Sequence, residues 1–370
     1  MNQIQAITLI QADIPVFIWG DPGCGKTQWA RALATAAGFH NGAHVNLETG
    51  KVVSWHFHTE TLAQCDASDI GGIPRDNGAY IIRKPLKWLH DLCVEPGLLF
   101  LDEAPLAPRM NLAASLRLIC EREAGDATLH PESRVMAAGN SSAFTGVDLM
   151  PQVANRFAHI EFEELMPLAQ WVQGMIAGFP PPQVARLPET WQAHIPTHRA
   201  LVASYVSKMP TEAFRVPKDG SGLGRAWPSR RTWDLAARAS AACGAAGVDD
   251  ALPIGSLVGD GPALSYIGWR ERQDLPDPEE VLANAATWVL PEEDDRLFVI
   301  LSACAAAAVA KPDPKKWGQA WVVVGRAARG KKVDVAVLAA RVLVAQAPPG
   351  SKTPKVAEEL IPLLRAAGGG

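Results

Sequence analysis

Residues 20–27 read Gly-Asp-Pro-Gly-Cys-Gly-Lys-Thr, and this run constrains the fold more than any other part of the chain. The apolar run 15–19 before it predicts a buried strand, and the alanine- and leucine-rich run 26–37 after it predicts a helix. The spacing G-x-x-x-x-G-K-[ST] between a strand and a helix is typical of a loop that binds nucleotide phosphates. Its glycines allow backbone conformations that a β-carbon forbids, so that N–H groups and the positive end of the helix can point at phosphate oxygens.

The positions of this loop have distinct expected roles. We expect Lys26 to reach the β- and γ-phosphates of a nucleotide and the hydroxyl of Thr27 to ligate Mg²⁺. The alternative is a glycine-rich turn that only connects a strand to a helix, and we disfavour it because every position of the motif is filled. The expected nucleotide-binding residues are Gly20, Asp21, Pro22, Gly23, Cys24, Gly25, Lys26, Thr27 and Gln28.

The composition is that of a globular protein with more than one domain. A length of 370 residues predicts two or three domains, and a hydrophobic content of 48% supplies their cores. Lys and Arg total 35 against 39 Asp and Glu, so the net charge of −4 gives no support to a broad nucleic-acid-binding surface. The six cysteines form no C-x-x-C pair, which favours reduced thiols in a cytosolic protein.

The sequence shows no pattern of export or of membrane insertion. Residues 1–5 lack the basic start of a signal peptide, and no run approaches the ~20 apolar residues that a membrane span needs. We therefore expect a cytoplasmic protein without a membrane span.

Strand-like and helix-like runs alternate in the first half of the chain. Such alternation predicts a mainly parallel sheet that is covered by helices on both faces. The segment 65–87 interrupts the alternation, and its Gly-rich and β-branched runs predict a loop followed by an inserted β-hairpin. The expected strands are 16–19, 52–57, 98–101, 135–138 and 159–162. The clearest helix between them is expected at 112–123.

After about residue 165 the strand pattern stops and helical patterns follow. Asp277 before Pro278 is a helix-start signal, and the Gly-rich run 218–224 predicts a mobile loop. Further helices are expected at 297–310, 333–346 and 355–367. The predicted domains are an α/β nucleotide-binding domain at 1–165, an α-helical lid at 166–247 and a C-terminal helical region at 248–370.

A second motif follows the expected strand 98–101. Its four apolar residues are followed by Asp102 and Glu103, and ligands of open α/β sheets bind beyond the carboxyl ends of the strands. We expect Asp102 to hold Mg²⁺ through its water shell and Glu103 to orient and deprotonate the attacking water. Alone, this run would be interpreted as a strand that ends in a solvated acidic turn, but the complete phosphate loop upstream favours the catalytic interpretation.

Further polar residues become candidates through their order along the chain. Asn140 follows a strand-like run, where its amide would bind the γ-phosphate or the attacking water; alone, Asn after Gly is ordinary turn chemistry. Arg156 would stabilise transition-state charge, acting from a neighbouring subunit, and the alternative is a surface salt bridge. Arg230 and Arg231 begin a helix, and one of them would couple the lid to the nucleotide; a solvated helix start is the alternative.

This order of motifs resembles that of the AAA+ ATPases, and within them the MoxR-type branch, over residues 15–165 and near 228–236. The segment 56–60 with Asp69-Ile70-Gly71 is similar to that branch's Q-F-T…D-I-x-G element. The segment 78–86 resembles its helix-2 insertion, except that Lys84 replaces the usual glycine. The helix at 116–122 resembles its L-x-x-x-M-E-E element.

The arginines also match the family pattern. Asn155-Arg156-Phe157 matches the [DN]-R-F arginine finger, and Ser229-Arg230-Arg231 is similar to the S-P-R sensor element, with Arg230 where proline is usual. The resemblance implies an α/β AAA+ core with a five-stranded, mainly parallel sheet, followed by a helical lid and a C-terminal helical region. It implies ATP and Mg²⁺ as cofactors, with Glu103, Asn140, Arg156 and Arg231 as catalytic residues.

The resemblance further implies a hexameric ring that hydrolyses ATP at its subunit interfaces. The implied partners are other copies of the chain, a protein with a von Willebrand factor A domain, and a protein substrate that is remodelled or loaded. A nucleic-acid-dependent motor on the same core is a second hypothesis, which the acidic net charge disfavours. A nucleotide-switched scaffold with little turnover is a third, and the presence of Glu103 disfavours it.

Overall fold

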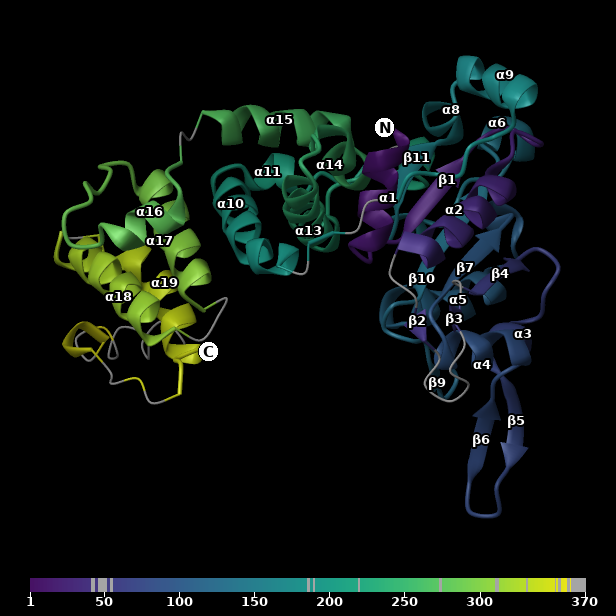
Figure 1. The fold of residues 1–370 in the computed structure, drawn as a ribbon, viewed down its shortest axis with the longest axis horizontal. Coiled ribbons are helices and arrows are strands. Elements are labelled where there is room, and N and C mark those ends of the chain that lie inside the picture. The colour runs from purple at the N-terminus through teal and green to yellow at the C-terminus, as the bar shows by residue number, and fades with distance from the viewer. Residues whose placement is uncertain are drawn as a thin grey trace. The chain divides into compact units, whose positions relative to one another are not determined.

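The computed structural model divides the chain into two compact units, Met1–Pro188 with Phe214–Ala263 and Glu189–Ala213 with Leu264–Gly370. Figure 1 shows the elements of both units along the chain. The residues that the structure describes are 1–40, 44–45, 52–53, 56–184, 187–188, 190–218, 220–272, 275–309, 313–330, 332–349, 351, 354–357 and 360.

A five-stranded parallel sheet forms the centre of the first unit (Figure 1). Its strand order is β11-β1-β10-β7-β4, and each neighbouring pair is parallel. The three central strands β1, β10 and β7 are apolar runs that are almost entirely buried, as a sheet covered by helices requires, whereas the edge strand β4 is mostly polar. The predicted α/β class and the five-stranded sheet are confirmed. The strands are β1 Val16–Trp19, β4 His56–Thr61, β7 Gly97–Asp102, β10 Arg134–Gly139 and β11 Ala158–Glu161.

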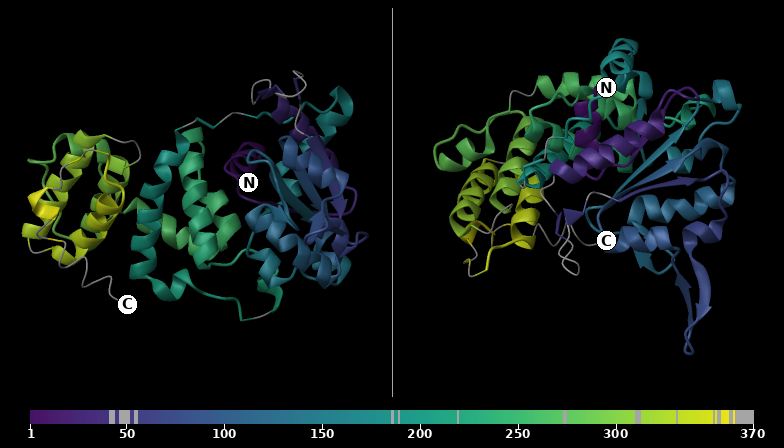
Figure 2. Two further views of the ribbon diagram at one scale, coloured as in Figure 1. Left: turned by 90° about the horizontal axis from the view of Figure 1, so that it is seen from below. Right: turned by 45° about the vertical axis from the view of Figure 1, so that its right-hand side comes forward.

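Helices lie on both faces of this sheet (Figure 2). The helix after the phosphate loop, α2, packs against β4 and β7, while the N-terminal helix α1 packs against β1 and β10. On its other side α1 contacts α13 and α14 from the later part of the chain. The covering helices are α1 Gln3–Gln11, α2 Lys26–His40, α4 Lys87–Val94, α5 Arg109–Glu121, α13 Arg230–Ala246 and α14 Ala251–Val258.

A β-hairpin follows α3 (Ala67–Gly71) and extends away from the sheet (Figure 1). Its strands β5 (Ile73–Asp76) and β6 (Ile81–Lys84) pair antiparallel within the segment where the sequence predicted an insertion. Tyr80 near its tip is 65% exposed.

One predicted strand needs correction. The described residues of the predicted strand 52–57 belong to two strands: β3 (Val52–Val53) pairs antiparallel with β2 (His44–Val45), while the strand of the main sheet is β4. Residues 54 and 55 lie outside the described part of the chain. The error has a physical cause, because the apolar run ends before β4, whose polar residues pair with the buried strand β7.

Short elements complete the first unit. The predicted mobile loop 218–224 contains the helical turn α12, and residue 219 lies outside the described residues. Ser229 caps α13 by accepting a hydrogen bond from the N–H of Thr232 at 3.2 Å. The short elements are the 3₁₀ turn Ala104–Leu106, β8 Glu123–Ala124, β9 Ala127–Thr128, α6 Ser142–Thr145, α7 Pro151–Ala154, α8 Phe162–Leu165, α9 Leu168–Ala177 and α12 Gly220–Leu223.

Among the described residues, the regular elements of the second unit are all helices, as the sequence predicted for this part of the chain. Helices α17, α18 and α19 pack on one another around Trp317 and Trp321, and α10 packs against α17. Asp277 caps α16 as expected, by accepting from the N–H of Glu279 at 2.9 Å. The helices are Trp191–His194 (3₁₀), α10 Ile195–Lys208, α11 Pro210–Ala213, α15 Asp260–Glu271 (which crosses the unit boundary), α16 Pro278–Ala283, α17 Asp294–Val309, α18 Pro314–Arg329 and α19 Val333–Ala345.

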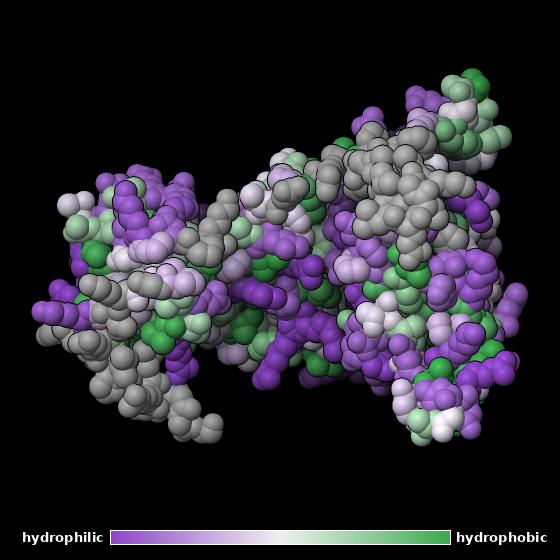
Figure 3. Space-filling model, turned by 60° about the horizontal axis from the view of Figure 1, so that its bottom comes forward, coloured by the Kyte–Doolittle hydropathy of each residue, from purple (hydrophilic) through white to green (hydrophobic). Residues whose placement is uncertain are grey.

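The boundaries of the two units differ from those of the three predicted domains. The helical region after residue 165 is shared between them, because α13 packs on α1 whereas α10 packs on α17. The expected helix 355–367 lies mostly outside the described residues. On the face shown in Figure 3, hydrophilic and hydrophobic residues are interspersed. Across the described chain, none of the helices has both the length and the hydrophobicity needed to cross a bilayer.

Candidate functional site

The order of the strands brings three of the sequence motifs together. The phosphate loop follows β1, Asn140 follows β10, and Asp102 ends β7, and these are three neighbouring strands. Because the strands are parallel, their carboxyl ends meet at one edge of the sheet. The register places Trp19 of β1 opposite Gly139 of β10, so the loop begins beside Asn140.

The phosphate loop is closed around the ammonium group of Lys26. Its Nζ donates hydrogen bonds to the carbonyl oxygens of Gly20 at 2.9 Å and Asp21 at 3.0 Å. The turn depends on Gly23 and Gly25, whose φ values of +80° and +108° fall where side chains are strongly disfavoured. Lys26 is buried, so its charge lies inside the loop, where phosphate oxygens would meet it.

Lys26 also joins the loop to the next strand. Its Nζ donates to Oδ1 of Asn140 at 3.0 Å. The sequence placed Asn140 near the γ-phosphate only through its order along the chain, and this contact brings the two side chains to one point. A phosphate bound in the loop would replace carbonyl and amide acceptors around Lys26 with charged oxygens, which make stronger hydrogen bonds.

Thr27 and Asp102 meet at the position expected for a metal ion. The hydroxyl of Thr27 donates to Oδ2 of Asp102 at 3.0 Å, and Oδ1 of Asp102 accepts from the N–H of Glu103 at 2.9 Å. Among the described residues, no group of three His, Cys, Asp or Glu side chains is arranged to hold a metal. Two protein oxygens fit Mg²⁺, which keeps several waters and takes further oxygens from phosphates.

Glu103 has an unusual backbone conformation. Its φ of 54° and ψ of 33° lie in the left-handed region, which few non-glycine residues adopt. Pro105 in the following 3₁₀ turn packs closely on β10, since a β-carbon on Gly139 would lie 2.3 Å from its Cδ. The tight turn therefore fixes the position of Glu103 at the end of β7. Backbone strain of this kind is common at functional sites.

A cavity of about 470 Å³ lies directly beside the phosphate loop, and the sequence motifs did not predict it. It is lined by Cys24 and Gln28 and by aromatic side chains including Trp29 and Phe162. The indole N–H of Trp29 is buried and has no hydrogen-bond partner. The described lining residues carry no charge, and an apolar, aromatic cavity with a few amide groups fits a flat heteroaromatic base.

A second residue that the sequence did not single out is Arg225. Its guanidinium lies 3.8 Å from the ring centroid of Trp19 and donates to Oε1 of Glu161 at 2.9 Å. Trp19 ends β1 and Glu161 ends β11, so Arg225 lies at the edge where the loop begins. Only a long-range contact reveals this position, because no local motif surrounds Arg225.

Arg156 and Arg231 are not brought to this group of residues. Both line a different cavity, of about 220 Å³, at the amino ends of β1 and β10, where Arg134 also lies. The guanidinium of Arg156 donates to the carbonyl oxygen of Gln152 and, from Nε, to Sγ of Cys120 at 2.6 Å. This cavity lies at the opposite edge of the sheet from the phosphate loop, and the roles of Arg156 as a finger and of Arg231 as a sensor stay predictions.

The two arginine motifs share that cavity because the residues beside them interact. The side-chain amide of Asn155 donates to the carbonyl oxygen of Trp227 at 3.0 Å, and its Oδ1 accepts from the hydroxyl of Ser229 at 2.6 Å. Asn155 therefore anchors the start of α13, which carries Arg231, beside the segment that carries Arg156.

The solved structures to which this chain was found similar share little sequence with it. No protein-family model matches the chain, and no curated protein matches its sequence. A provisionally assigned ATPase from Cytophaga hutchinsonii is similar to it at 15% identity and a TM-score of 0.43, over 66% of this chain and 74% of the other. NtrX from Brucella abortus is similar at 13% identity and a TM-score of 0.28, over 99% of this chain and 67% of the other.

Proposed function

We propose that this chain is a Mg²⁺-dependent ATPase of the AAA+ class, with the MoxR-type branch as its nearest resemblance. The observation that carries the proposal is the convergence of Lys26, Thr27, Asp102 and Asn140 at one edge of the sheet through hydrogen bonds of 3.0 Å. Phosphoryl transfer requires positioning and charge neutralisation more than covalent chemistry, and these side chains supply both.

Each residue has a role that its position supports. Lys26 would neutralise the β- and γ-phosphates, while Thr27 and Asp102 would hold Mg²⁺, which supplies further charge neutralisation when it is bound. Glu103 would accept the proton of the attacking water, and Asn140 would orient the water or the γ-phosphate. The cavity at Trp29 would take the base, and its unpartnered indole N–H offers that base a hydrogen bond.

Arg156 supports the proposal that the active unit is a ring. It lies at the amino ends of the strands, whereas its own phosphate loop follows their carboxyl ends. A guanidinium so placed would serve the nucleotide of a neighbouring copy. We propose a hexameric, cytoplasmic ring that remodels or loads a protein, with a von Willebrand factor A domain protein as its partner.

ATP binding and hydrolysis by the full chain test this proposal. We expect Lys26→Ala to abolish ATP binding in calorimetry, because the buried ammonium group is the charge at the centre of the loop. Glu103→Gln should bind ATP but release phosphate at least about a hundredfold more slowly, since only the proton acceptor is lost. Lys84→Ala, which removes an exposed lysine of the hairpin, is the matched control.

Two results would contradict the proposal. ATP affinity that is equal in Lys26→Ala and wild type would remove the phosphate-loop interpretation. Wild-type turnover in Glu103→Gln would remove Glu103 from the mechanism. If Glu103→Gln holds ATP as expected, its complexes from cell extract can be identified by mass spectrometry, which tests the proposed partner.

A further inference from the structure

The cavity at the amino ends of β1 and β10 is unusually rich in arginine. We call it the arginine cavity, and it is lined by Asp13, Arg122, Arg134, Arg156, Arg231 and Arg238 together with apolar residues. Asp13 is the one carboxylate among its described lining residues. Five guanidinium groups therefore line a space of about 220 Å³.

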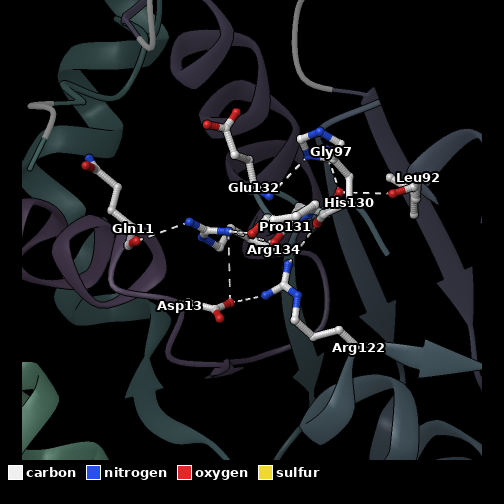
Figure 4. A network of polar contacts seen from close by, with 10 residues as sticks. Gln11, Asp13, Leu92, Gly97, Arg122, His130, Pro131, Glu132 and Arg134 are labelled. Carbon is white, nitrogen blue, oxygen red and sulfur yellow. Dashed lines mark hydrogen bonds and ion pairs between the residues drawn. The ribbon is translucent and has the colours of Figure 1, made fainter. Parts of the chain in front are cut away.

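The charges at the base of this cavity are not balanced. Arg122 and Arg134 both point at Asp13, one from the end of α5 and the other from the start of β10 (Figure 4). Arg122 makes an ion pair with Asp13, and Arg134 lies 4.0 Å from the same carboxylate. Two partly buried guanidinium groups thus share a single counter-charge, and buried charge without a partner is costly.

The other hydrogen bonds that these two arginines make within the described part of the chain go to backbone carbonyl oxygens. Arg134 donates to the carbonyl oxygens of Pro131 at 3.0 Å and Ser133 at 2.8 Å, which fix the side chain but cancel no charge. The Nε–H groups of Arg122 and Arg134 are both buried without a hydrogen-bond partner. Burial lowers the pKa of Arg134, and the positive charges of Arg122 and Arg238 lower it further, whereas the negative charges of Asp13 and Glu132 oppose the shift.

A purely structural role explains part of this arrangement. The contacts of Asp13 join the turn between α1 and β1 to the end of α5 and the start of β10. Such a role needs one carboxylate and its two arginines. It does not by itself account for the guanidinium groups of Arg156, Arg231 and Arg238, which line the same space.

We propose that the arginine cavity binds an oxyanion of the phosphate class, such as inorganic phosphate or pyrophosphate. Guanidinium groups match tetrahedral oxyanions through pairs of parallel hydrogen bonds, and several of them together favour an ion with more than one charge. This site goes beyond the proposed function, since it is separate from the phosphate loop of the same copy. The length of β1, four residues or roughly 13 Å, lies between them.

Binding is measured on the full-length Lys26→Ala variant, whose phosphate loop is disabled, by titration calorimetry with pyrophosphate and with phosphate. We expect binding in this background. Arg238→Gln should weaken it by at least about tenfold, because a charged hydrogen bond is lost. Arg75→Gln makes the same charge change on the exposed strand β5 and should leave the affinity unchanged.

A variant that should bind pyrophosphate more tightly serves as a second test, because misfolding could explain a loss of binding but not a gain. Asp13→Asn removes the competing carboxylate, so pyrophosphate should bind several-fold more tightly. Asparagine tolerates the left-handed backbone of this position, where φ is 58°. The proposal is overturned if Lys26→Ala binds no pyrophosphate, or if Arg238→Gln and Asp13→Asn bind it as their parent does.

The phosphate groups have two possible sources, a free ion or a nucleotide held by a second copy of the chain. ATP-loaded Glu103→Gln protein is therefore added to Lys26→Ala protein that carries radiolabelled pyrophosphate. Release of the label shows that the nucleotide of a neighbouring copy occupies the arginine cavity. Retention of the label assigns the cavity to the free ion, and both results require that the cavity binds phosphate oxygens.

Discussion

The stability of the first unit should fall sharply as the pH drops, because the surroundings of the half-buried His159 hold it in its neutral form. Its Nδ1 accepts a hydrogen bond from the indole N–H of Trp19 at 2.8 Å, and its Nε2 donates to the carbonyl oxygen of Ala154 at 2.9 Å. Both bonds are satisfied by one neutral tautomer, and a second proton on Nδ1 would break the contact with Trp19.

The size of the effect follows from the surroundings of this ring. Burial lowers the pKa of His159 to about 4 from an ordinary 6.5, the hydrogen bond to Ala154 opposes the shift, and the charge of Arg225 adds to it. The difference corresponds to roughly 3 kcal/mol. Because the unfolded chain binds this proton more readily, the stabilisation is complete above pH 6.5 and is lost as the pH falls towards 4.

Histidine-labelled protein titrated by NMR gives the pKa of His159 directly, with the resonance assigned from its absence in His159→Gln. Denaturant unfolding of the wild type and of His159→Gln between pH 7 and 4 gives the unfolding free energy of each protein. The difference between these two free energies should shrink by roughly 3 kcal/mol as the pH falls. Arg225→Gln should reduce this loss, because the nearby positive charge is gone. The reasoning would be refuted if the imidazole of His159 titrated near pH 6.5. It would also be refuted if the unfolding free energies of the wild type and of His159→Gln fell in parallel with pH.

Two further predictions concern the site itself. Arg156→Ala mixed with Glu103→Gln should regain part of the ATPase activity that each variant lacks alone, because an intact finger from one copy can serve an intact site on another; no activity at any mixing ratio would contradict action between subunits. Gly139→Ala should lower the unfolding free energy by about 1–3 kcal/mol and slow hydrolysis, because its β-carbon would lie 2.3 Å from a proline side chain beside Glu103. Gly244→Ala, where nothing lies within 4 Å of a β-carbon, is the control and should unfold at the same or a higher denaturant concentration.

The sequence predicted the parts of the site that depend on local patterns. The strand before the loop, the glycine spacing, Lys26 and Thr27 form one continuous motif, and β1 has the predicted bounds. Asp102 and Asn140 were found because each follows an apolar run that could only be a buried strand. Parallel strands then bring their ends to one edge, so the convergence follows from the fold class.

The remainder depends on contacts between distant parts of the chain. Arg225 lies on Trp19 although more than two hundred residues separate them, and no periodicity encodes that contact. Trp29 was assigned to a helix without any sign that its indole would line a cavity. The helix α18 was missed although Asp313 caps it, accepting from the N–H of Lys315 at 2.9 Å, and this local signal could have been used.

The two edges of the sheet also restrict how copies of this chain can work together. If Arg156 acts on a nucleotide held by a second copy, the amino edge of one unit must face the carboxyl edge of the next. A twofold dimer is built from one patch that faces its own copy, so it would bring a loop to an arginine cavity only if both lay within that patch. Head-to-tail contact is the alternative, and it closes into a ring when the rotation per subunit divides the full circle. If Arg156 acts between copies, the polarity of a parallel sheet thus favours the head-to-tail contacts of the proposed ring.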